Sequence, residues 1–510
     1  MRKGRHPCVT VIKVDTTNIK KMTFTSRGLS VAKPRYDTTI FSGLILLIVV
    51  LFSLSGQAAP MLPELGSGEG SLVNLTHDKS IAEQVLRNLR HDDLILDDPL
   101  LSEYIQNLGN RIASQANWKR GSFHFFLIKD MDINAFALPA GYIGINAGLF
   151  LRSQSEDELA AVLAHEISHV TQRHHNRASE YIEKQNVFLA AAIIAAIASG
   201  GNDSGASMAI LMGSMANNLH ANLAYSRNNE QEADRVGIEL LYRANFDGQG
   251  MVQFFDKLHQ SQRFNDGEYT KYLRSHPVTL ERLSDARNRL KQASTQKKYH
   301  TSDYLLMWQR LAHLTEAPDG IFTEPPQTHL SKLYKQSLKL EQSEEYGKIL
   351  ELLQPVLKGQ ADSIPLSIYI ADTYQKTGQN LQSLKLYQQL HELYPTQTSI
   401  TLGYCKQLLH NKQTRQAKVL LRKAIRQQQP VMPELYKLLA RIETQRGASA
   451  SAYRYLSTYY FETGRPHQAL QQLAQGLDTP GLSFYEREEL EAQQTMVREH
   501  IQMLESLPGQ

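Results

Sequence analysis

The sequence predicts a mainly α fold, in which an α+β domain with a small sheet precedes an all-α domain of helical repeats. A chain of 510 residues is too long for one hydrophobic core, so at least two domains are expected. In its first half, two short strand-like segments lie among amphipathic helical patterns. Beyond residue 328 the pattern is helical and repeats at intervals of 34 to 35 residues.

The first 58 residues have the pattern of a cleavable signal peptide. Residues 40–54 are uncharged and apolar, follow basic residues, and are shorter than the roughly 20 residues that a bilayer span requires. Small residues come next, so we expect cleavage after Ala58; an uncleaved signal anchor is the alternative. Translation can begin at Met1 or at Met22, and the sequence does not decide between them.

Loss of this segment changes the charge of the chain. It contains nine Lys or Arg and two Asp, so the counts of 55 and 51 fall to 46 and 49, and the net charge goes from +4 to −3. The basic balance therefore belongs to the export signal and does not indicate a nucleic-acid partner. The segment also contains Cys8, which leaves Cys405 without an internal disulfide partner.

Residues 59–310 are expected to form the α+β domain. Asp98 and Pro99 have the pattern of a helix start, and strands are expected at 123–128 and 142–148, separated by a turn-forming segment. A helix follows from Glu156 to about His175, and further helices follow residue 226. Residues 187–212 form two apolar arms around a polar turn. They predict a helical hairpin packed on the domain, or a flap that makes peripheral contact with a membrane or a hydrophobic client.

The C-terminal part is expected to bind partners. Residues 311–327 contain three prolines and no periodicity, which is typical of a linker. From 328 to 485 small and aromatic residues recur at the spacing of about four tetratricopeptide repeats, and 486–510 is expected to be a helical tail. Such repeats stack into a solenoid whose concave surface binds peptides or proteins. Cys405 falls at a small-residue packing position, so we expect it in the core.

The segment HEISH carries the expected chemistry. His165 and His169 are four residues apart on a predicted helix, so both can reach one metal ion. Glu166 projects beside them and is suited to take a proton from a water held by the ion. A catalytic zinc site has three protein ligands and an open fourth position, so a third ligand is required.

Glu230 is the best candidate for that ligand. The sequence does not continue as HExxHxxGxxH, and we expect His174 and His175 to face solvent or to lie behind the ligands. Glu230 lies 61 residues after His169 in NEQEAD, and Asp234 follows one turn later, where it can fix the tautomer of a ligand histidine.

A predicted strand lies shortly before the helix that carries HEISH. It comprises Tyr142, Ile143, Gly144, Ile145 and Asn146, and we expect it to be an edge strand that pairs with an extended substrate.

Three segments in this order resemble the M48 family of zinc metallopeptidases: NAFALPAGYIGINAGLF, SEDELAAVLAHEISHV and SRNNEQEADRVG. The resemblance implies a zinc metalloendopeptidase that binds one Zn²⁺ per subunit through His165, His169 and Glu230. It makes Glu166 the general base and Asp234 the acid behind the ligands. SHPVTLERL also matches, which implies that His276 is a removable fourth ligand or, together with Arg282, stabilises the oxyanion; an interdomain or helix-cap histidine before Pro277 is the alternative.

The signal peptide and the repeats extend the resemblance. The extended resemblance implies a periplasmic enzyme that degrades misassembled outer-membrane proteins and assists their assembly as a chaperone. It further implies that the repeats contact assembling clients and the β-barrel assembly machinery. One alternative is a chaperone or scaffold whose zinc site is latent or structural. Another is an M48 peptidase anchored in the inner membrane by residues 40–54.

Overall fold

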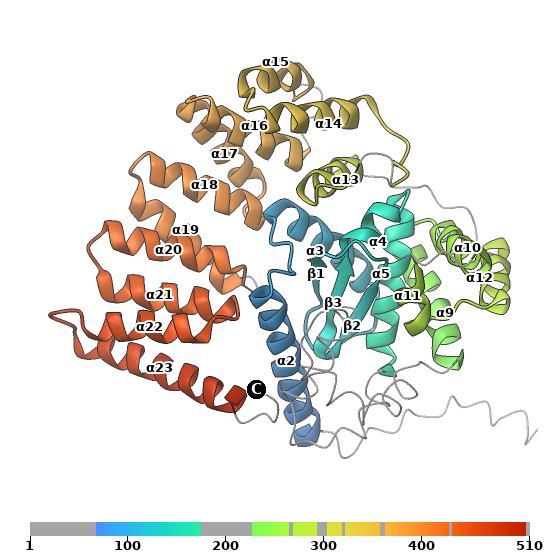
Figure 1. Cartoon of the computed structure of the whole chain (residues 1–510), viewed down its shortest axis with the longest axis horizontal. Helices are drawn as coiled ribbons and strands as arrows, with labels where there is room; N and C mark the ends of the chain where they lie inside the picture. The colour runs from blue at the N-terminus through green and yellow to red at the C-terminus, as the bar shows by residue number, and fades with distance from the viewer. Residues whose placement is uncertain are drawn as a thin grey trace, which may run out of the picture. The chain divides into compact units, whose positions relative to one another are not determined.

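The computed structural model describes residues 68–174, 227–264, 269–292, 303–318, 322–357, 363–427 and 431–505. The predicted signal peptide, the two possible starts, the apolar segment 187–212 and His175 lie outside these residues. None of the described helices combines the length and the apolar character needed to cross a membrane. The predicted fold class is confirmed, because one small sheet lies among many helices (Figure 1).

The sheet has three strands in the order β1-β3-β2: β1 (His124–Ile128), β2 (Ala135–Leu138) and β3 (Tyr142–Asn146). Strand β1 runs parallel to β3, and β2 runs antiparallel to it. Strand β2 and β3 are joined by the short 3-10 helix η1 (Pro139–Gly141), in which Ala140 and Gly141 have φ values of 59° and 85°. Such positive φ values reverse the chain within three residues.

Two sequence predictions about this sheet are wrong. Residues 135–138 fall in the segment predicted to be a turn, but they form β2. Strand β3 was predicted to be an edge strand, but it is paired on both sides and lies in the middle of the described sheet. Gly144 at its centre is covered by the rings of Phe126 and Phe136, because a Cβ there would lie 2.9 and 2.6 Å from them.

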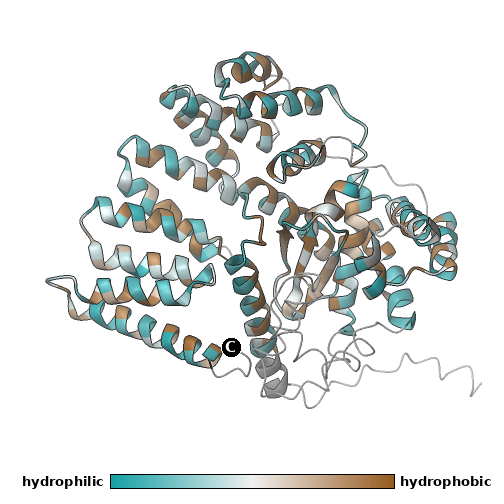
Figure 2. Ribbon diagram, viewed as in Figure 1, coloured by the Kyte–Doolittle hydropathy of each residue, from teal (hydrophilic) through white to brown (hydrophobic). Residues whose placement is uncertain are grey.

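Helix α5 (Glu156–Thr171) is the centre of the first domain. It begins at Ser155, whose hydroxyl accepts a hydrogen bond from the Glu158 N–H at 3.2 Å, and almost all its residues are buried. It packs against β2, α3 (Pro99–Ala113), α9 (Arg227–Arg243) and α10 (Gln249–Phe264). Figure 2 shows the strands in the brown of hydrophobic residues. Burial on all sides explains why residues 159–164 of α5 are apolar without interruption.

Further helices complete this part of the chain: α2 (Gly68–His91), α4 (Ala147–Arg152), α11 (Thr270–Ser275), α12 (Leu280–Gln292) and α13 (Asp303–Leu314). Tyr304 and Trp308 of α13 donate hydrogen bonds to the carbonyls of Ser153 and Leu151 at 2.6 and 3.1 Å. Helix α13 therefore packs on the end of α4.

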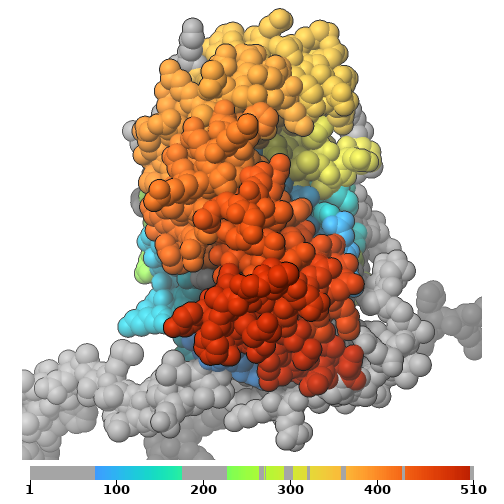
Figure 3. Space-filling model, turned by 90° about the vertical axis from the view of Figure 1, so that its left-hand side faces the viewer, coloured from blue at the N-terminus to red at the C-terminus, as the bar shows by residue number. Residues whose placement is uncertain are grey.

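The C-terminal part consists, in the described residues, of helices that stack in chain order (Figures 1 and 3). They are α14 (His329–Gln342), α15 (Tyr346–Leu357), α16 (Ile364–Lys376), α17 (Asn380–Leu393), α18 (Thr398–His410), α19 (Thr414–Gln427), α20 (Pro433–Gln445), α21 (Ser449–Glu462), α22 (Pro466–Leu477) and α23 (Phe484–Glu505). Consecutive helices contact each other along the whole series.

Small residues lie where these helices meet. Six of the small residues at the repeat spacing are buried: Ala371, Ser383, Cys405, Ala417, Ala440 and Ala452. A Cβ on Gly403 would lie 2.3 Å from the Tyr387 ring, so glycine allows α17 and α18 to pack closely. Burial raises the pKa of the Cys405 thiol to about 12, which agrees with a core position and an unreactive thiol.

Candidate metal centre

Four buried side chains offer nitrogen and oxygen atoms to one point in the first domain. One atom from each of His165, His169, Glu230 and His276 lies within 4.8 Å of the others. The Nε2 atoms of His165 and His169 are 3.0 Å apart, and the nearest Glu230 oxygens are 3.5 and 3.3 Å from them. Imidazole and carboxylate are ligands that zinc prefers.

Two helices position the three predicted ligands. His165 and His169 lie one turn apart on α5, and Glu230 lies in the first turn of α9. Gly237 of α9 faces the backbone of Ala164, since a Cβ on it would lie 3.4 Å from Ala164 C and O. This close approach brings a glutamate from one helix next to two histidines of another, although 61 residues separate them in the sequence.

Asp234 and Arg282 support the ligands from behind. One Asp234 oxygen lies 3.0 Å from His165 Nδ1, the ring nitrogen that faces away from the other donors. Arg282 donates to both Asp234 oxygens at 2.7 and 2.8 Å, and its Nη1 lies 2.8 Å from Glu230. Burial alone would raise the pKa of Asp234, but the Arg282 guanidinium reverses the effect and holds that pKa below its usual value. Asp234 is therefore an ionised carboxylate 3.0 Å from His165 Nδ1, placed to favour a proton on that nitrogen.

Glu166 is the buried carboxyl that faces this group without taking part in it. Its Oε1 lies 3.6 Å from His276 Nε2, and this buried oxygen has no hydrogen-bond partner among the described residues. Burial raises the pKa of Glu166, and the neighbouring histidines oppose that shift. A carboxyl whose pKa is raised toward neutrality is a better proton acceptor than an ordinary glutamate.

His276 lies inside the donor group. It follows α11, its Nδ1 is 3.3 Å from His165 Nε2 and 3.3 Å from both Glu230 oxygens, and the Tyr272 ring packs on it at 4.8 Å. Arg282, in contrast, is engaged with Asp234, Glu230 and the Pro277 carbonyl. The resemblance associates these two residues with one role, but in the structure His276 lies among the metal donors, whereas Arg282 forms ion pairs with Asp234 and Glu230.

His174 lies behind the ligand His169, which is one of the two positions that the sequence predicts for it. It does not face solvent: it is buried, its Nδ1 lies 2.9 Å from His169 Nδ1, and its Nε2 lies 3.3 Å from Glu232. Helix α5 ends at Thr171, and Arg173 has a φ of 55°, so the chain turns back toward His169. Helical spacing beyond Thr171 therefore gave no guide to its position.

Residues 99–290 match the model of Peptidase family M48. This part of the chain is similar to that family, and we call it the M48 domain. It includes all four donors of the buried group, Glu166 and the residues behind them.

The similarity to named relatives covers more residues than the match to the M48 model. The chain is 35% identical over 316 residues to the beta-barrel assembly-enhancing protease of Yersinia pestis, and 34% identical over 306 residues to that of Escherichia coli K12. These alignments cover 60% and 59% of this chain, and 65% and 62% of the two relatives. The chain is also 26% identical over 215 residues to the metalloprotease LoiP of Escherichia coli K12, covering 42% of this chain and 80% of LoiP.

The M48 domain fits a zinc ion. M48 metallopeptidases depend on zinc, and the domain has a buried His, His and Glu group whose atoms converge on one point. Two of these donors, His165 and His169, have their remaining ring nitrogen within 3.0 Å of Asp234 or His174, as expected for histidines that bind a metal.

Proposed function

We propose that this protein is a zinc-dependent endopeptidase. The observation that carries the proposal is the position of Glu166, a buried carboxyl that lies 3.6 Å from His276, beside the four converging metal donors, and is not one of them. A purely structural zinc site needs four ligands and no adjacent base. His165, His169 and Glu230 would hold the ion. When bound, zinc polarises the scissile carbonyl and acidifies water.

Residues of the domain would transfer the proton and orient the metal ligands. Glu166 accepts a proton from the attacking water and delivers it to the leaving amine. Asp234 keeps the proton of His165 on Nδ1, so Nε2 presents its lone pair to the ion. Arg282 holds Asp234 and Glu230 in place. Because its guanidinium is engaged in these ion pairs, it is not available to bind the oxyanion. We therefore assign Arg282 to positioning, and an oxyanion role to His276 alone.

His276 has two functions in the proposal. In the described arrangement it completes a set of four donors, which corresponds to a latent centre. Movement of the segment after α11 would remove its ring from Glu230 and free that position for a substrate. A histidine close to that position is also suited to donate a hydrogen bond to the oxyanion.

An extended substrate would add to the free edge of β2. Strand β2 is an edge of the described sheet, and it packs beside α5, which carries Glu166. Backbone hydrogen bonds to such an edge hold a peptide in extended form without requiring a particular sequence. Strand β3, whose five residues were predicted to do this, supports β2 from the inside.

The cellular role is proposed from the relatives and from the sequence. Two relatives are named for enhancing β-barrel assembly. We propose that this protein is exported to the periplasm, that it degrades misassembled outer-membrane β-barrel proteins and assists their assembly, and that its repeats contact these clients and the assembly machinery. A chaperone with a latent centre is the second candidate, favoured by His276 among the donors.

Glu166→Gln distinguishes the two candidates. We expect it to lower cleavage of an unfolded outer-membrane β-barrel protein by about 10²–10⁴-fold, because the amide cannot accept a proton. Bound zinc, measured by elemental analysis, should stay at one ion per chain, since Glu166 is not a ligand. Glu239→Gln, on the exposed face of α9, is the matched control and should cleave normally. Unchanged cleavage by Glu166→Gln would refute the peptidase proposal.

A further inference from the structure

The positive charge of the C-terminal part is concentrated around α19. Between Glu392 and Glu434 the sequence contains no Asp or Glu and seven Lys or Arg, whereas the whole chain is nearly balanced at 55 basic to 51 acidic residues. Five of the seven lie on α19 (Thr414–Gln427). A single helix thus carries much of the local charge.

The charged face of α19 points away from the helices that it packs on. Ala417 and Leu421 are its buried residues. Arg415, Arg422 and Arg426 are exposed. Arg422 and Arg426 lie seven and eleven residues after Arg415, so all three are on the same side of the helix. We call this side, with the exposed Val419 between the arginines, the basic face.

The arginines of the basic face have no counter-ions in the described part of the chain. Lys418, on a neighbouring side of α19, lies 2.5 Å from the buried Glu443 and is neutralised by it. No carboxylate of the described residues lies within ion-pair distance of Arg415, Arg422 or Arg426. Like charges on successive turns repel one another, so the face is a source of free energy for binding an anionic partner.

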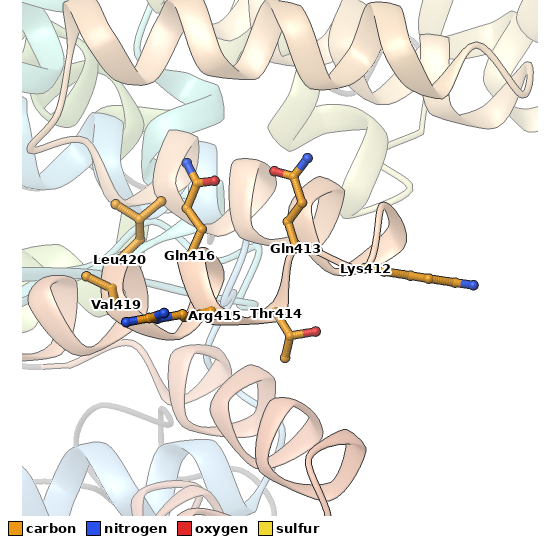
Figure 4. Close-up of a pocket in the computed structure, with 7 residues that line it drawn as sticks. All are labelled: Lys412, Gln413, Thr414, Arg415, Gln416, Val419 and Leu420. Carbon is orange, nitrogen blue, oxygen red and sulfur yellow. The ribbon is translucent and has the colours of Figure 1, made fainter.

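A hollow opens at the N-terminal end of the same helix (Figure 4). It has a volume of about 560 Å³, and its lining includes Lys412, Arg415, Gln413, Gln416 and Val419. Figure 4 shows the side chains of Gln413 and Gln416 on the same side of the ribbon. The Gln416 amide nitrogen donates to the Tyr404 hydroxyl at 3.2 Å, which orients that side chain. Its oxygen and the Gln413 amide can pair with the backbone of a peptide.

We propose that the basic face and its hollow are a docking surface for a carboxylate-rich segment of a partner protein. The planar guanidinium of arginine binds carboxylates in a bidentate manner, and three of them along one helix fit side chains spaced along an extended or helical segment. A bilayer surface fits less well. Val419 is the one large exposed apolar side chain on the described α19, so the face offers little to insert among lipids.

The test uses the full chain and a fluorescent twelve-residue peptide of alternating Glu and Ser as the probe. Wild-type protein is compared with Arg415→Gln/Arg422→Gln/Arg426→Gln. The matched control, Lys332→Gln/Lys385→Gln/Arg498→Gln, removes the same charge from exposed positions on other helices. Binding is followed by fluorescence anisotropy at two salt concentrations, and thermal unfolding verifies that each variant folds.

The proposal expects the arginine variant to bind the peptide about tenfold more weakly or worse, the control to bind like wild type, and salt to weaken wild-type binding. Equal losses in both variants would overturn it, since net charge alone would then account for binding. Arginine-dependent binding to phosphatidylglycerol vesicles without binding to the peptide would assign the face to a membrane instead. Salt-sensitive self-association that the arginine variant abolishes would assign it to the acidic α23 of a second copy. None of these outcomes depends on the metal centre.

Discussion

His169 is oriented by a second histidine. To bind a metal through Nε2, His169 must carry its proton on Nδ1, which lies 2.9 Å from His174 Nδ1. His174 must then accept on Nδ1 and carry its own proton on Nε2, which lies 3.3 Å from Glu232. The series Glu232, His174 and His169 therefore fixes one tautomer at each ring. Asp234 fixes the tautomer of His165 directly, without an intervening residue.

We predict that His174→Ala weakens zinc binding by about 10–100-fold, because His169 loses the acceptor that holds its ring. Competition with a fluorescent zinc chelator measures the affinity without reference to activity. Glu232→Gln should have a smaller effect in the same direction, since the amide oxygen still accepts from His174. His467→Ala, at an exposed histidine of α22, is the control. Zinc affinity equal to wild type in His174→Ala would refute this orienting role.

His124 makes stability depend on pH. It is buried in β1 against the Tyr142 ring at 4.6 Å, and its Nδ1 has no hydrogen-bond partner among the described residues. Burial lowers the pKa of this imidazole from 6.5 to about 4. A lowered folded pKa means that the unfolded chain binds the proton first. The associated stability is complete above pH 6.5 and is lost as the pH falls toward 4.

As the pH falls from 7.5 to 4.5, protonation of His124 in the unfolded chain should lower the free energy of unfolding by at most about 3 kcal/mol. We predict that His124→Phe, which keeps a ring beside Tyr142, loses less stability than wild type over this interval. The free energy of unfolding in urea, measured at both pH values, gives the comparison. The metal ligands titrate in both proteins, so their contribution cancels in the difference. Identical pH dependence of the two proteins would contradict the prediction.

At the scale of residues, the sequence predicted those site positions that lie on regular helices. His165 and His169 share a face because they are four residues apart on α5, and Glu230 and Asp234 share a face for the same reason on α9. The position of His174 was not predictable in this way. It depends on a turn with a positive φ at Arg173, a conformation that arginine rarely adopts.

At the scale of elements, the crossing of α5 and α9 determines the geometry of the centre. A Cβ on Gly237 would lie 3.2 Å from Met251 Cε and 3.4 Å from the backbone of Ala164. Glycine in a helix costs roughly 1 kcal/mol relative to alanine, so its presence here is explained by packing. A residue larger than alanine must push α9 away from α5, and Glu230 and Asp234 would move with α9.

We predict that Gly237→Leu lowers zinc affinity and destabilises the fold by about 1–3 kcal/mol through overpacking. Gly237→Ala should be nearly neutral, because the gain in helix propensity offsets the tight contacts. Glu239→Leu places the same side chain on the exposed face of α9 and is the control. Chelator competition and thermal unfolding provide the two measurements. Normal zinc affinity in a folded Gly237→Leu protein would show that the helix crossing does not determine the site.

The sheet shows which elements were harder to predict. Residues 135–138 are only four, and Asp, Asn, Pro and Gly surround them, so turn-forming composition concealed β2. Without β2 the sequence indicates only one partner strand for β3, so it predicts β3 at the edge of the sheet. Strand order depends on pairing between segments, which a single sequence does not contain. The helices were easier because each has its own apolar periodicity.

At the scale of the whole chain, the sequence predicted an α+β domain followed by helices, but not how α3 of the M48 domain meets α18. The residue before α18, Gln397, makes no side-chain cap to that helix. Glu103 of α3 takes this place. Its carboxylate accepts hydrogen bonds from the N–H groups of Thr398 and Ser399 at 2.6 and 3.2 Å, and from the Ser399 hydroxyl. A negative charge at a helix N-terminus is favourable, so this cap joins the two helices.

We predict that Glu103→Gln loosens this junction without affecting the metal centre. The amide has one acceptor oxygen where the carboxylate has two, so buried N–H groups of α18 lose a partner at a cost of about 1–3 kcal/mol. Hydrogen exchange should accelerate in the first turn of α18, and zinc affinity should stay at the wild-type value. Glu488→Gln, at an exposed glutamate of α23, is the control for the loss of charge. Unchanged exchange in α18 would mean that its N-terminus is held by contacts other than Glu103, and that α3 and α18 are coupled by apolar packing alone.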